Sequence, residues 1–297
     1  MVRRGKGIEV DIPKSYDTLR EEAEKGIHEI LKDYPKAEKM YKFLVNDGEV
    51  NGYWDVANFM LTQKLKYNDH GEVHAKIVAY SACKMLSLLK DYGIKPDFLS
   101  HGGGDWDDEF LIVLSAALLH DIGNLVIRPR HYDFSVSLAI PILNRYLPQI
   151  YGDDLEKRAE VKSFILNALY THEAEVMPYT LEGAIVGLAD GTDMTKGRGR
   201  LAFDLGEAGI HTVSALSIEK VIILKGEKRP IRIVVEMSNS AGVFQVEEIL
   251  AKKIRFSPLE NYVEIYAITI PTGVEKDRRI VYEVTVKNGR ITAEHKE

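Results

Sequence analysis

Apolar residues recur at spacings of three and four along the first two thirds of the chain. This is the pattern of helices that bury one face against a core. Glycine and proline interrupt the pattern, for example at Asp47-Gly48, Pro129 and Pro148, where helices are expected to end. The pattern therefore predicts helices near residues 17–45, 52–66, 70–91, 109–122, 133–147, 157–173 and 180–193.

The pattern changes after about residue 203, where short segments rich in β-branched and aromatic residues replace the helical spacing. Such segments are typical of strands. Asn288-Gly289 is a strong two-residue hairpin signal, and it leads into the segment RITAE. The predicted strands are residues 218–225, 231–237, 262–270 and 280–287.

One helix interrupts these strands, and its shared apolar face is formed by Val246, Ile249, Leu250 and Ile254. Ser240 or Asn239 is expected to cap its start. The fold is therefore predicted to be α+β with two domains. An all-helical domain covers residues 1–205, and a small α+β domain covers residues 212–297. The order of the second domain, β-β-α-β-β, is similar to ferredoxin-like and ACT modules. A dimerising surface, which would make the chain a homodimer, and a small-molecule site are both open roles for this domain.

The amino-acid composition is that of an ordinary globular protein, and it excludes several kinds of site. The 297 residues carry a formal net charge of −6, and 45% of them are apolar, as in ordinary globular proteins. The mild acidity argues against a nucleic-acid coating role, because nothing steers the chain onto phosphate backbones. Cys83 is the only cysteine, which excludes an intrachain disulfide and a cysteine-based zinc site.

No segment has the character of a membrane anchor. The longest apolar run, residues 110–119, is about half of a membrane span. The basic start of the chain is followed by no apolar run, so it is not a signal peptide. The protein is therefore expected to be cytoplasmic, with no membrane partner.

His120 and Asp121 end the apolar segment EFLIVLSAALL, which is expected to be a buried helix. A carboxylate at this position is desolvated and lies at the negative end of the helix dipole. It needs a cation, and the adjacent imidazole favours a metal ion over an arginine or lysine. Any metal in this chain must be held by histidines and carboxylates.

Other histidines and acids lie on or near apolar helix faces. His74 shares a stripe with Val78 and Met85, and Asp190 shares one with Val186. Each residue alone is more simply explained as a hydrogen-bonded core residue, whereas convergence from four helices suits a divalent cation. The candidate site residues are His74, His120, Asp121, His131, His172 and Asp190.

The order of these residues resembles the HD superfamily of metal-dependent phosphohydrolases. The run His120-Asp121-Ile122-Gly123, after Ala-Ala-Leu-Leu, is similar to the central doublet of that family. His74, followed by Val78-Ala79, resembles the first motif, and Asp190 in Leu-Ala-Asp resembles the last. The resemblance covers about residues 68–195.

The resemblance implies four metal ligands, and their identity follows from the matching positions. His70 lies one turn before the first of them and is an alternative to it, although the Val-Ala offset favours His74. The implied ion is divalent, and Mn, Fe, Mg, Co and Ni all remain open. The implied ligands are His74, His120, Asp121 and Asp190.

A second ion is also implied. His131 and His172 resemble the extra histidines of the binuclear branch of the family, in which Asp121 would bridge two metals. His172 stands in Thr-His-Glu, whereas that branch often has two adjacent histidines, and Asn124 replaces a common lysine. Two ions are preferred, and one ion remains the alternative.

Two basic clusters flank the candidate ligands. Arg can place two donors on phosphate oxygens, and glycine lets a backbone approach an anion closely. Both clusters are therefore candidate substrate-binding groups, with solvated loops as the simpler alternative. The clusters are Arg128 and Arg130 before His131, and Lys196, Arg198 and Arg200 after Asp190.

The activity implied by the resemblance is hydrolysis of a phosphate monoester or diester, of a nucleotide or a related small molecule. A metal-activated water would be the nucleophile, and His120 and Asp121 would be the central catalytic pair. A nucleotide-binding regulatory protein without turnover is one alternative. A di-iron oxygenase is another.

Overall fold

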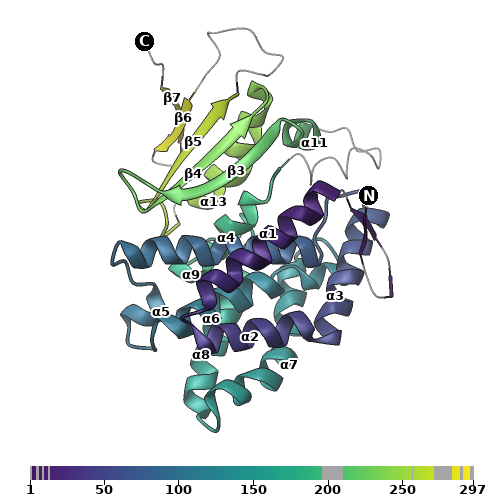
Figure 1. Ribbon diagram of the computed structural model, residues 1–297, viewed down its shortest axis with the longest axis vertical. Coiled ribbons are helices and arrows are strands. Elements are labelled where there is room, and N and C mark those ends of the chain that lie inside the picture. Colours follow the sequence, from purple (N-terminus) through teal and green to yellow (C-terminus); the bar gives the residue numbers. More distant parts are fainter. Residues whose placement is uncertain are drawn as a thin grey trace.

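A computed structural model describes residues 2–4, 7–8, 10–12, 14–195, 210–255, 257–270, 283–287 and 290–294. The helical part comes first in the chain, and the sheet of the C-terminal part lies against one side of it (Figure 1). This arrangement confirms the predicted fold class, an all-helical region followed by a small α+β region. No helix in the described ranges is both long and apolar enough to cross a membrane.

The helical part begins after a short antiparallel hairpin of β1 (Val2–Arg4) and β2 (Val10–Ile12). Its elements are α1 (Lys14–Leu31), α2 (Pro35–Asn46), α3 (Gly48–Phe59), η1 (Met60–Lys64), α4 (Glu72–Asp91), α5 (Asp97–Ser100), α6 (Trp106–Leu119), η2 (Ile122–Leu125), α7 (His131–Tyr151), α8 (Leu155–Tyr170) and α9 (Leu181–Thr192).

The continuous helical pattern over residues 17–45 belongs to two helices, α1 and α2, which corrects that part of the sequence interpretation. Pro35 is the first residue of α2, a position where the missing N–H costs nothing. Leu31 and Ala37 are buried on either side of the turn. The apolar spacing therefore continues across the turn and conceals the break.

Helix α6 is the central helix of this part. Every residue from Asp108 to Leu119 is buried, and the helix packs against α2, α4, α8 and α9. The Asp105 carboxylate accepts a hydrogen bond from the Asp108 N–H at 3.0 Å, and the Asp108 carboxylate accepts one from the Asp105 N–H at 3.1 Å. This capping box fixes the start of α6. The opposite end lies in the interior, where His120 and Asp121 follow it.

The C-terminal sheet has the order β3-β4-β5-β6-β7. Strands β4 and β5 are parallel, and the other neighbouring pairs are antiparallel. Strand β7 pairs with β6, as the hairpin signal indicates, while residues 288–289 lie outside the described residues. The elements are α11 (Ile210–Ala215), β3 (Ile218–Lys225), β4 (Ile231–Met237), η3 (Ser240–Gly242), α12 (Val243–Gln245), η4 (Val246–Ala251), α13 (Lys252–Ile254), β5 (Val263–Thr269), β6 (Glu283–Lys287) and β7 (Arg290–Glu294).

The crossover between β4 and β5 runs through η3, α12, η4 and α13, of which η4 and α13 pack on α9 of the helical part. Asn239 caps the start of this crossover, since its side chain accepts a hydrogen bond from the Ala241 N–H. Val246 and Leu250 are buried, as their shared face predicts. The crossover therefore brings Lys253 close to the helical core.

Two buried carboxyl groups, Glu109 of α6 and Glu182 of α9, hold the short helix α5. Glu109 Oε1 accepts a hydrogen bond from the Leu99 N–H at 2.7 Å, and Glu182 Oε1 accepts one from the Phe98 N–H at 2.8 Å. Their Oε2 atoms are buried and accept nothing from any described donor. Burial, together with the charge of Glu182, raises the pKa of Glu109 to about 9. The pair therefore holds a proton at neutral pH.

We expect Glu109→Gln to stabilise the fold at pH 8 by up to about 5 kcal/mol and to change it little near pH 4.5. The pKa of Glu109 is higher in the folded state than the 4.5 that is usual for a glutamate in water. The wild type therefore loses stability as the pH rises from about 4.5 towards 9, and glutamine cannot ionise. Urea unfolding at both pH values tests this. The control is Glu160→Gln, at an exposed residue of α8. Equal pH dependence of Glu109→Gln and wild type would contradict it.

Candidate metal centre

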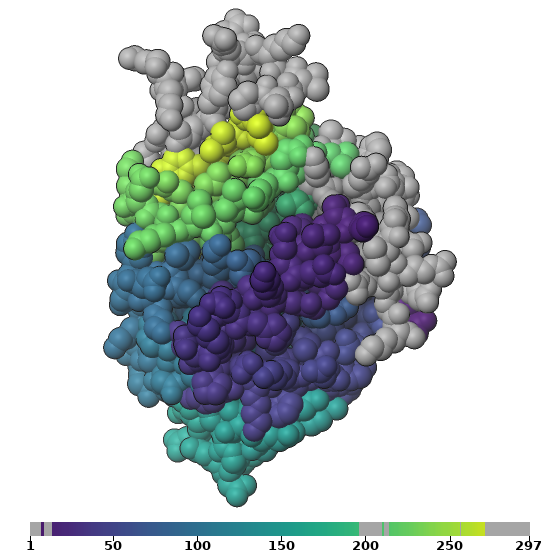
Figure 2. Space-filling model, viewed as in Figure 1, coloured from purple at the N-terminus to yellow at the C-terminus, as the bar shows by residue number. Residues whose placement is uncertain are grey.

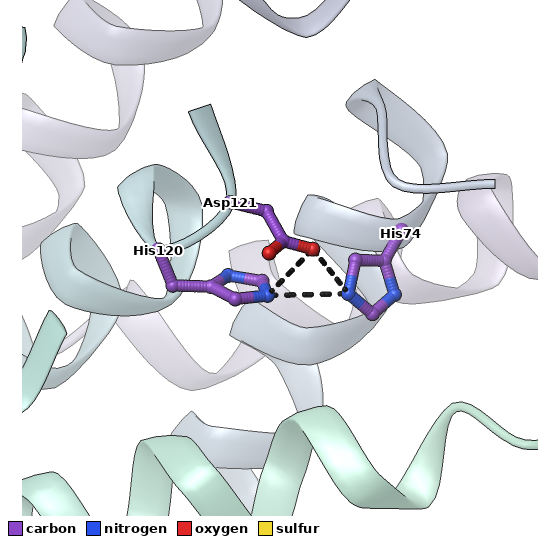
Figure 3. Close-up of side chains that lie close together, drawn as sticks. All are labelled: His74, His120 and Asp121. Atoms are coloured by element: carbon purple, nitrogen blue, oxygen red, sulfur yellow. Dashed lines mark hydrogen bonds and ion pairs between the residues drawn. The ribbon is translucent and has the colours of Figure 1, made fainter. Parts of the chain in front are cut away.

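Four side chains from three separate segments meet in the interior of the helical part. His74 comes from α4, His120 and Asp121 follow α6, and Asp190 comes from α9. His74 Nε2 lies 3.2 Å from His120 Nε2, 3.3 Å from Asp121 Oδ2 and 3.2 Å from Asp190 Oδ1. Figure 3 shows the first three side chains pointing toward one another. These four atoms form one donor group, called here the first group.

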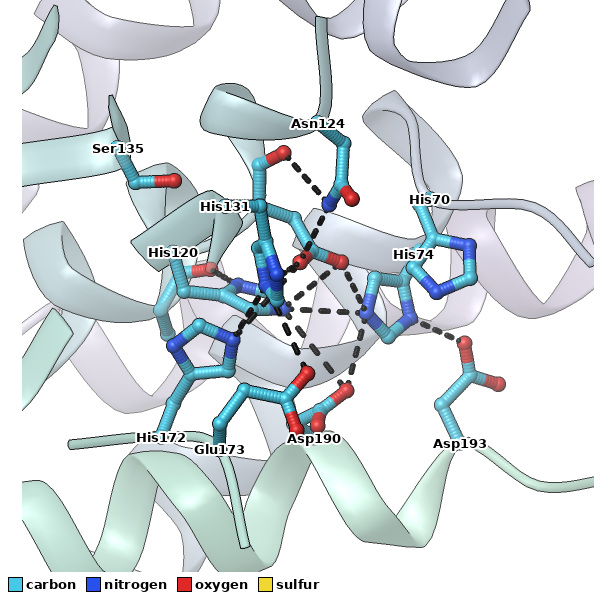
Figure 4. A network of polar contacts seen from close by, with 12 residues as sticks. His70, His74, His120, Asn124, His131, Ser135, His172, Glu173, Asp190 and Asp193 are labelled. Carbon is cyan, nitrogen blue, oxygen red and sulfur yellow. Dashed lines mark hydrogen bonds and ion pairs between the residues drawn. The ribbon is translucent and has the colours of Figure 1, made fainter. Parts of the chain in front are cut away.

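A second donor group lies on the other side of Asp121. His131 Nε2 is 3.0 Å from Asp121 Oδ1, and His172 Nε2 is 3.8 Å from the same oxygen. The two imidazole nitrogens are 3.0 Å apart. Asp121 therefore presents Oδ2 to the first group and Oδ1 to the second, as Figure 4 shows for the whole network.

The hydrogen bonds of the four imidazoles fix which ring nitrogens carry protons. The Nδ1–H groups of His120, His172 and His131 donate to the backbone carbonyls of Ala117, Leu169 and Arg128, at 2.8, 2.6 and 3.2 Å. A carbonyl only accepts, so in the neutral ring each Nε2 is left as a bare lone pair. The Nδ1–H of His74 donates in the same way to the Asp193 carboxylate, at 2.7 Å.

These lone pairs face one another in pairs, since His74 Nε2 faces His120 Nε2 and His131 Nε2 faces His172 Nε2. Neutral imidazoles in this state cannot hydrogen-bond to each other and repel at 3.0–3.2 Å. A cation between them removes the repulsion, and a metal-binding histidine normally donates its other N–H in this manner. The two groups, with their nitrogen and oxygen donors, can therefore hold a divalent metal.

Burial and charge set the protonation of the acids. Burial opposes ionisation of Asp121, but the neighbouring His120 and His70 outweigh it and hold the pKa of Asp121 well below its usual range. Burial likewise opposes ionisation of Asp190, but the Lys253 ammonium and His74 hold its pKa well below the usual range. Both carboxylates are therefore charged and ready to bind a cation at neutral pH.

His172 stays neutral for a different reason. Burial lowers the pKa of His172 well below its usual range, and His120 and His131 lower it further because a proton on either ring would repel one on His172. A metal ligand must be deprotonated at the binding nitrogen. The interior position of His172 therefore keeps it in the binding state without competition from protons.

Local structure explains why the second group forms next to the first. After α6 the chain makes the tight turn η2, which is packed against the start of α7. At Gly123 a Cβ would overlap the His131 carbonyl and the Ser135 amide. The Gly123 N–H donates to Ser135 Oγ at 2.8 Å. Only glycine permits this approach, and the approach places His131 beside Asp121.

Three supporting residues were not found by sequence reasoning. Lys253 Nζ donates to Asp190 Oδ2 at 2.6 Å and to the His172 carbonyl at 2.8 Å. Asp193 accepts from both His74 and Tyr16, the latter at 2.6 Å. Asp193 has a local signal, because it stands one turn after Asp190. Lys253 and Tyr16 have none, because they come from distant parts of the chain.

His74, and not His70, supplies the nitrogen nearest the other donors of the first group. The His70 ring centroid lies 5.4 Å from that of His74, and its Nδ1 bonds to the Asn68 carbonyl at 2.8 Å. His70 belongs to neither donor group within the described ranges. Asn124 donates to Asp121 Oδ1 at 2.9 Å and so supports the shared carboxylate.

The candidate substrate-binding residues are placed differently from one another. Arg128 lies at the second group, with one nitrogen 3.2 Å from Glu173 Oε1 and another 4.0 Å from Asp121 Oδ1. Arg130 is turned away, since its side chain is 72% exposed and pairs with Asp133 at 2.7 Å. The remaining three candidates, Lys196, Arg198 and Arg200, lie outside the described residues.

Comparison with known proteins gives one informative relative. No family model matches the chain, and no solved structure matches it. An uncharacterized protein of Methanocaldococcus jannaschii is 41% identical over 256 residues, which are 86% of this chain and 95% of the relative. The chain belongs to the same family as this archaeal protein. The shared span includes most of both chains, and the relative carries no described activity.

Proposed function

We propose that this protein is a metal-dependent phosphohydrolase of the HD type, acting on a small phosphate ester. The observation that carries the proposal is Asp121, which faces two donor groups with its two oxygens. A carboxylate shared in this way suits a pair of metal ions held close together. The ligand order along the chain, His then His-Asp then Asp, supports the HD assignment.

Bound divalent ions would supply a water of lowered pKa and draw charge from phosphoryl oxygens. The side chains of the protein would hold these ions in place. His74, His120 and Asp190 hold the first group, and His131 and His172 hold the second. The four histidines are buried, and the Asp190 side chain is 18% exposed, so bulk water has little access to the donors.

Arg128 is the residue placed to receive a phosphate. Its guanidinium is 30% exposed and stands beside the second group, with Glu173 as its partner. A forked donor of this kind binds phosphoryl oxygens in pairs. A substrate anion would therefore displace Glu173 as the partner of Arg128 and lie beside the metal-binding donors.

The test is hydrolysis by the purified protein loaded with Mn²⁺ or Co²⁺. Aryl phosphate monoesters, aryl phosphate diesters and a panel of nucleotides are the substrates, and we expect turnover that EDTA abolishes. Arg128→Ala is expected to lower kcat/KM by about 10- to 100-fold, the contribution of one or two charged hydrogen bonds. Arg130→Ala, two residues away and turned to solvent, is the matched control.

The other outcomes separate the alternative functions. Tight nucleotide binding without product would support a regulatory protein. Bound iron with oxygen consumption would support an oxygenase. Metal-loaded protein that neither binds nor hydrolyses any phosphate would contradict the proposal.

A further inference from the structure

A cavity of about 740 Å³ lies where helix α1, helix α4 and the end of α9 meet strand β3. Figure 2 shows α1, in purple, directly against the green C-terminal part at this junction. Strand β3 is an edge strand of the sheet, so its outer side is not covered by another strand. A cavity at a junction of two structural parts is a common location for a small-molecule site.

The walls of the cavity are mainly apolar. Leu19 and Ala23 line it from α1, Ile77 lines it from α4, and Val221 and Ile223 line it from β3. The volume exceeds what isolated packing defects leave in protein interiors. The walls are therefore suited to an apolar ligand body rather than to a chain of ordered waters.

The floor of the same cavity is polar and is bonded to the metal centre. Tyr16 and Asp193 both line the cavity, and both are almost fully buried. The Tyr16 hydroxyl donates to Asp193 Oδ2, and the same oxygen accepts the Nδ1–H of His74. His74 Nε2, on the opposite side of its ring, belongs to the first donor group. One imidazole therefore separates the cavity floor from the metal-binding atoms.

Some charged side chains at the cavity form no ion pair with a described residue. Lys84 lies over the Tyr80 ring, with Nζ 5.7 Å from the centroid, and Lys220 is exposed on β3. Neither lysine makes an ion pair with a described residue. Two acids line the same cavity: Glu219 already has an interaction partner, and Glu22 lies on the exposed side of α1. The two lysines are thus available to an anionic group at the cavity.

We propose that this cavity binds an amphipathic small molecule with an apolar body and an anionic head, and that binding tightens the grip of His74 on its metal ion. The apolar body lies against Leu19, Ile77 and Ile223. The anionic head lies at Lys84 and Lys220. The inference depends on metal binding at the first group, but it does not depend on hydrolysis.

The coupling follows from the hydrogen bonds of the floor. A ligand that fills the cavity packs against the Tyr16 side chain and so fixes the position of the Asp193 carboxylate, to which Tyr16 donates its hydrogen bond. Asp193 then holds the His74 ring with Nε2 aimed at the other donors. An outer acceptor of this kind typically changes metal affinity by about 10- to 100-fold when it is lost. Thermodynamic linkage requires that bound metal raises the affinity of the cavity for its ligand by the same factor.

Binding is tested by calorimetry with decanoate below its micelle concentration. Decylammonium has the same chain and the opposite charge, and it serves as the matched probe. We expect decanoate to bind one molecule per chain and decylammonium to bind at least about tenfold more weakly. The double variant Lys84→Glu/Lys220→Glu should reverse this preference. Lys25→Glu, at an exposed residue of α1 outside the cavity, should not.

Coupling is tested by titrating Mn²⁺ with and without decanoate. We expect decanoate to lower the Kd for Mn²⁺ by about fivefold or more. The variant Tyr16→Phe should still bind decanoate but should lose this effect on the Kd. Absence of decanoate binding, or equal affinity for the two probes, would overturn the site. Coupling that persists in Tyr16→Phe would overturn the proposed route. Neither measurement needs turnover. Binding of Mn²⁺ and decanoate can therefore be measured, and the inference decided, even if the protein hydrolyses no phosphate ester.

Discussion

Replacing Asp121 by alanine is expected to remove metal from both donor groups at once. Among the described residues, only Asp121 contributes an oxygen to each group. Without it the second group keeps two uncharged imidazoles and no carboxylate, and the first keeps Asp190 as its single carboxylate. Loss of an outer partner already costs about 10- to 100-fold in metal affinity, so loss of the shared ligand should exceed about 100-fold. Metal analysis after dialysis against Mn²⁺ measures this directly.

Asp133→Ala is the matched control, because Asp133 pairs with Arg130 near the surface and touches neither group. The control should keep the full metal content of the wild type. His120→Ala is expected to lose the metal of the first group in the same assay. If Asp121→Ala retained the wild-type metal content, the ligand assignment would be wrong.

Replacing one histidine from each group should separate two ions. His172→Ala removes one of the two nitrogens of the second group but leaves all four donors of the first. His74→Ala does the reverse. We therefore expect each variant to bind one Mn²⁺ where the wild type binds two. The spin coupling between two close Mn²⁺ ions, measured by electron paramagnetic resonance, should disappear in both.

His101→Ala provides the control for this pair, since His101 is exposed and bonds only locally, to Asp97 and Ser100. It should bind two ions with their coupling intact. A wild type that binds a single ion, lost equally in His74→Ala and kept in His172→Ala, would show that only the first group is a metal site.

The sequence predicts the secondary structure well where the local pattern is unambiguous. The strands β3 and β4 begin and end at the predicted residues, because isoleucine and valine crowd both segments. The turn before Pro35 is the main failure. Buried residues on both of its sides keep the helical spacing, and the spacing therefore carries no sign of the break.

The same contrast holds for the candidate site. His120 and Asp121 stand out because a charged pair ends a wholly apolar segment, which local chemistry alone makes costly. The residues that hold the site's acids in place cannot be found from the local sequence pattern. Lys253 reaches Asp190 across 63 residues of sequence, and Tyr16 reaches Asp193 across 177. Such contacts depend on how whole segments pack, and a spacing rule contains no information about that.

The contact of Lys253 with Asp190 has a consequence for the evolution of the chain. The helical part contains every candidate ligand, yet one of its acids is neutralised by an ammonium group from the C-terminal crossover. Gene fragments that encode only the first part would leave that acid with an unbalanced interior charge. We therefore expect the two parts to be inherited together, and changes at residue 253 to be accompanied by changes at residue 190.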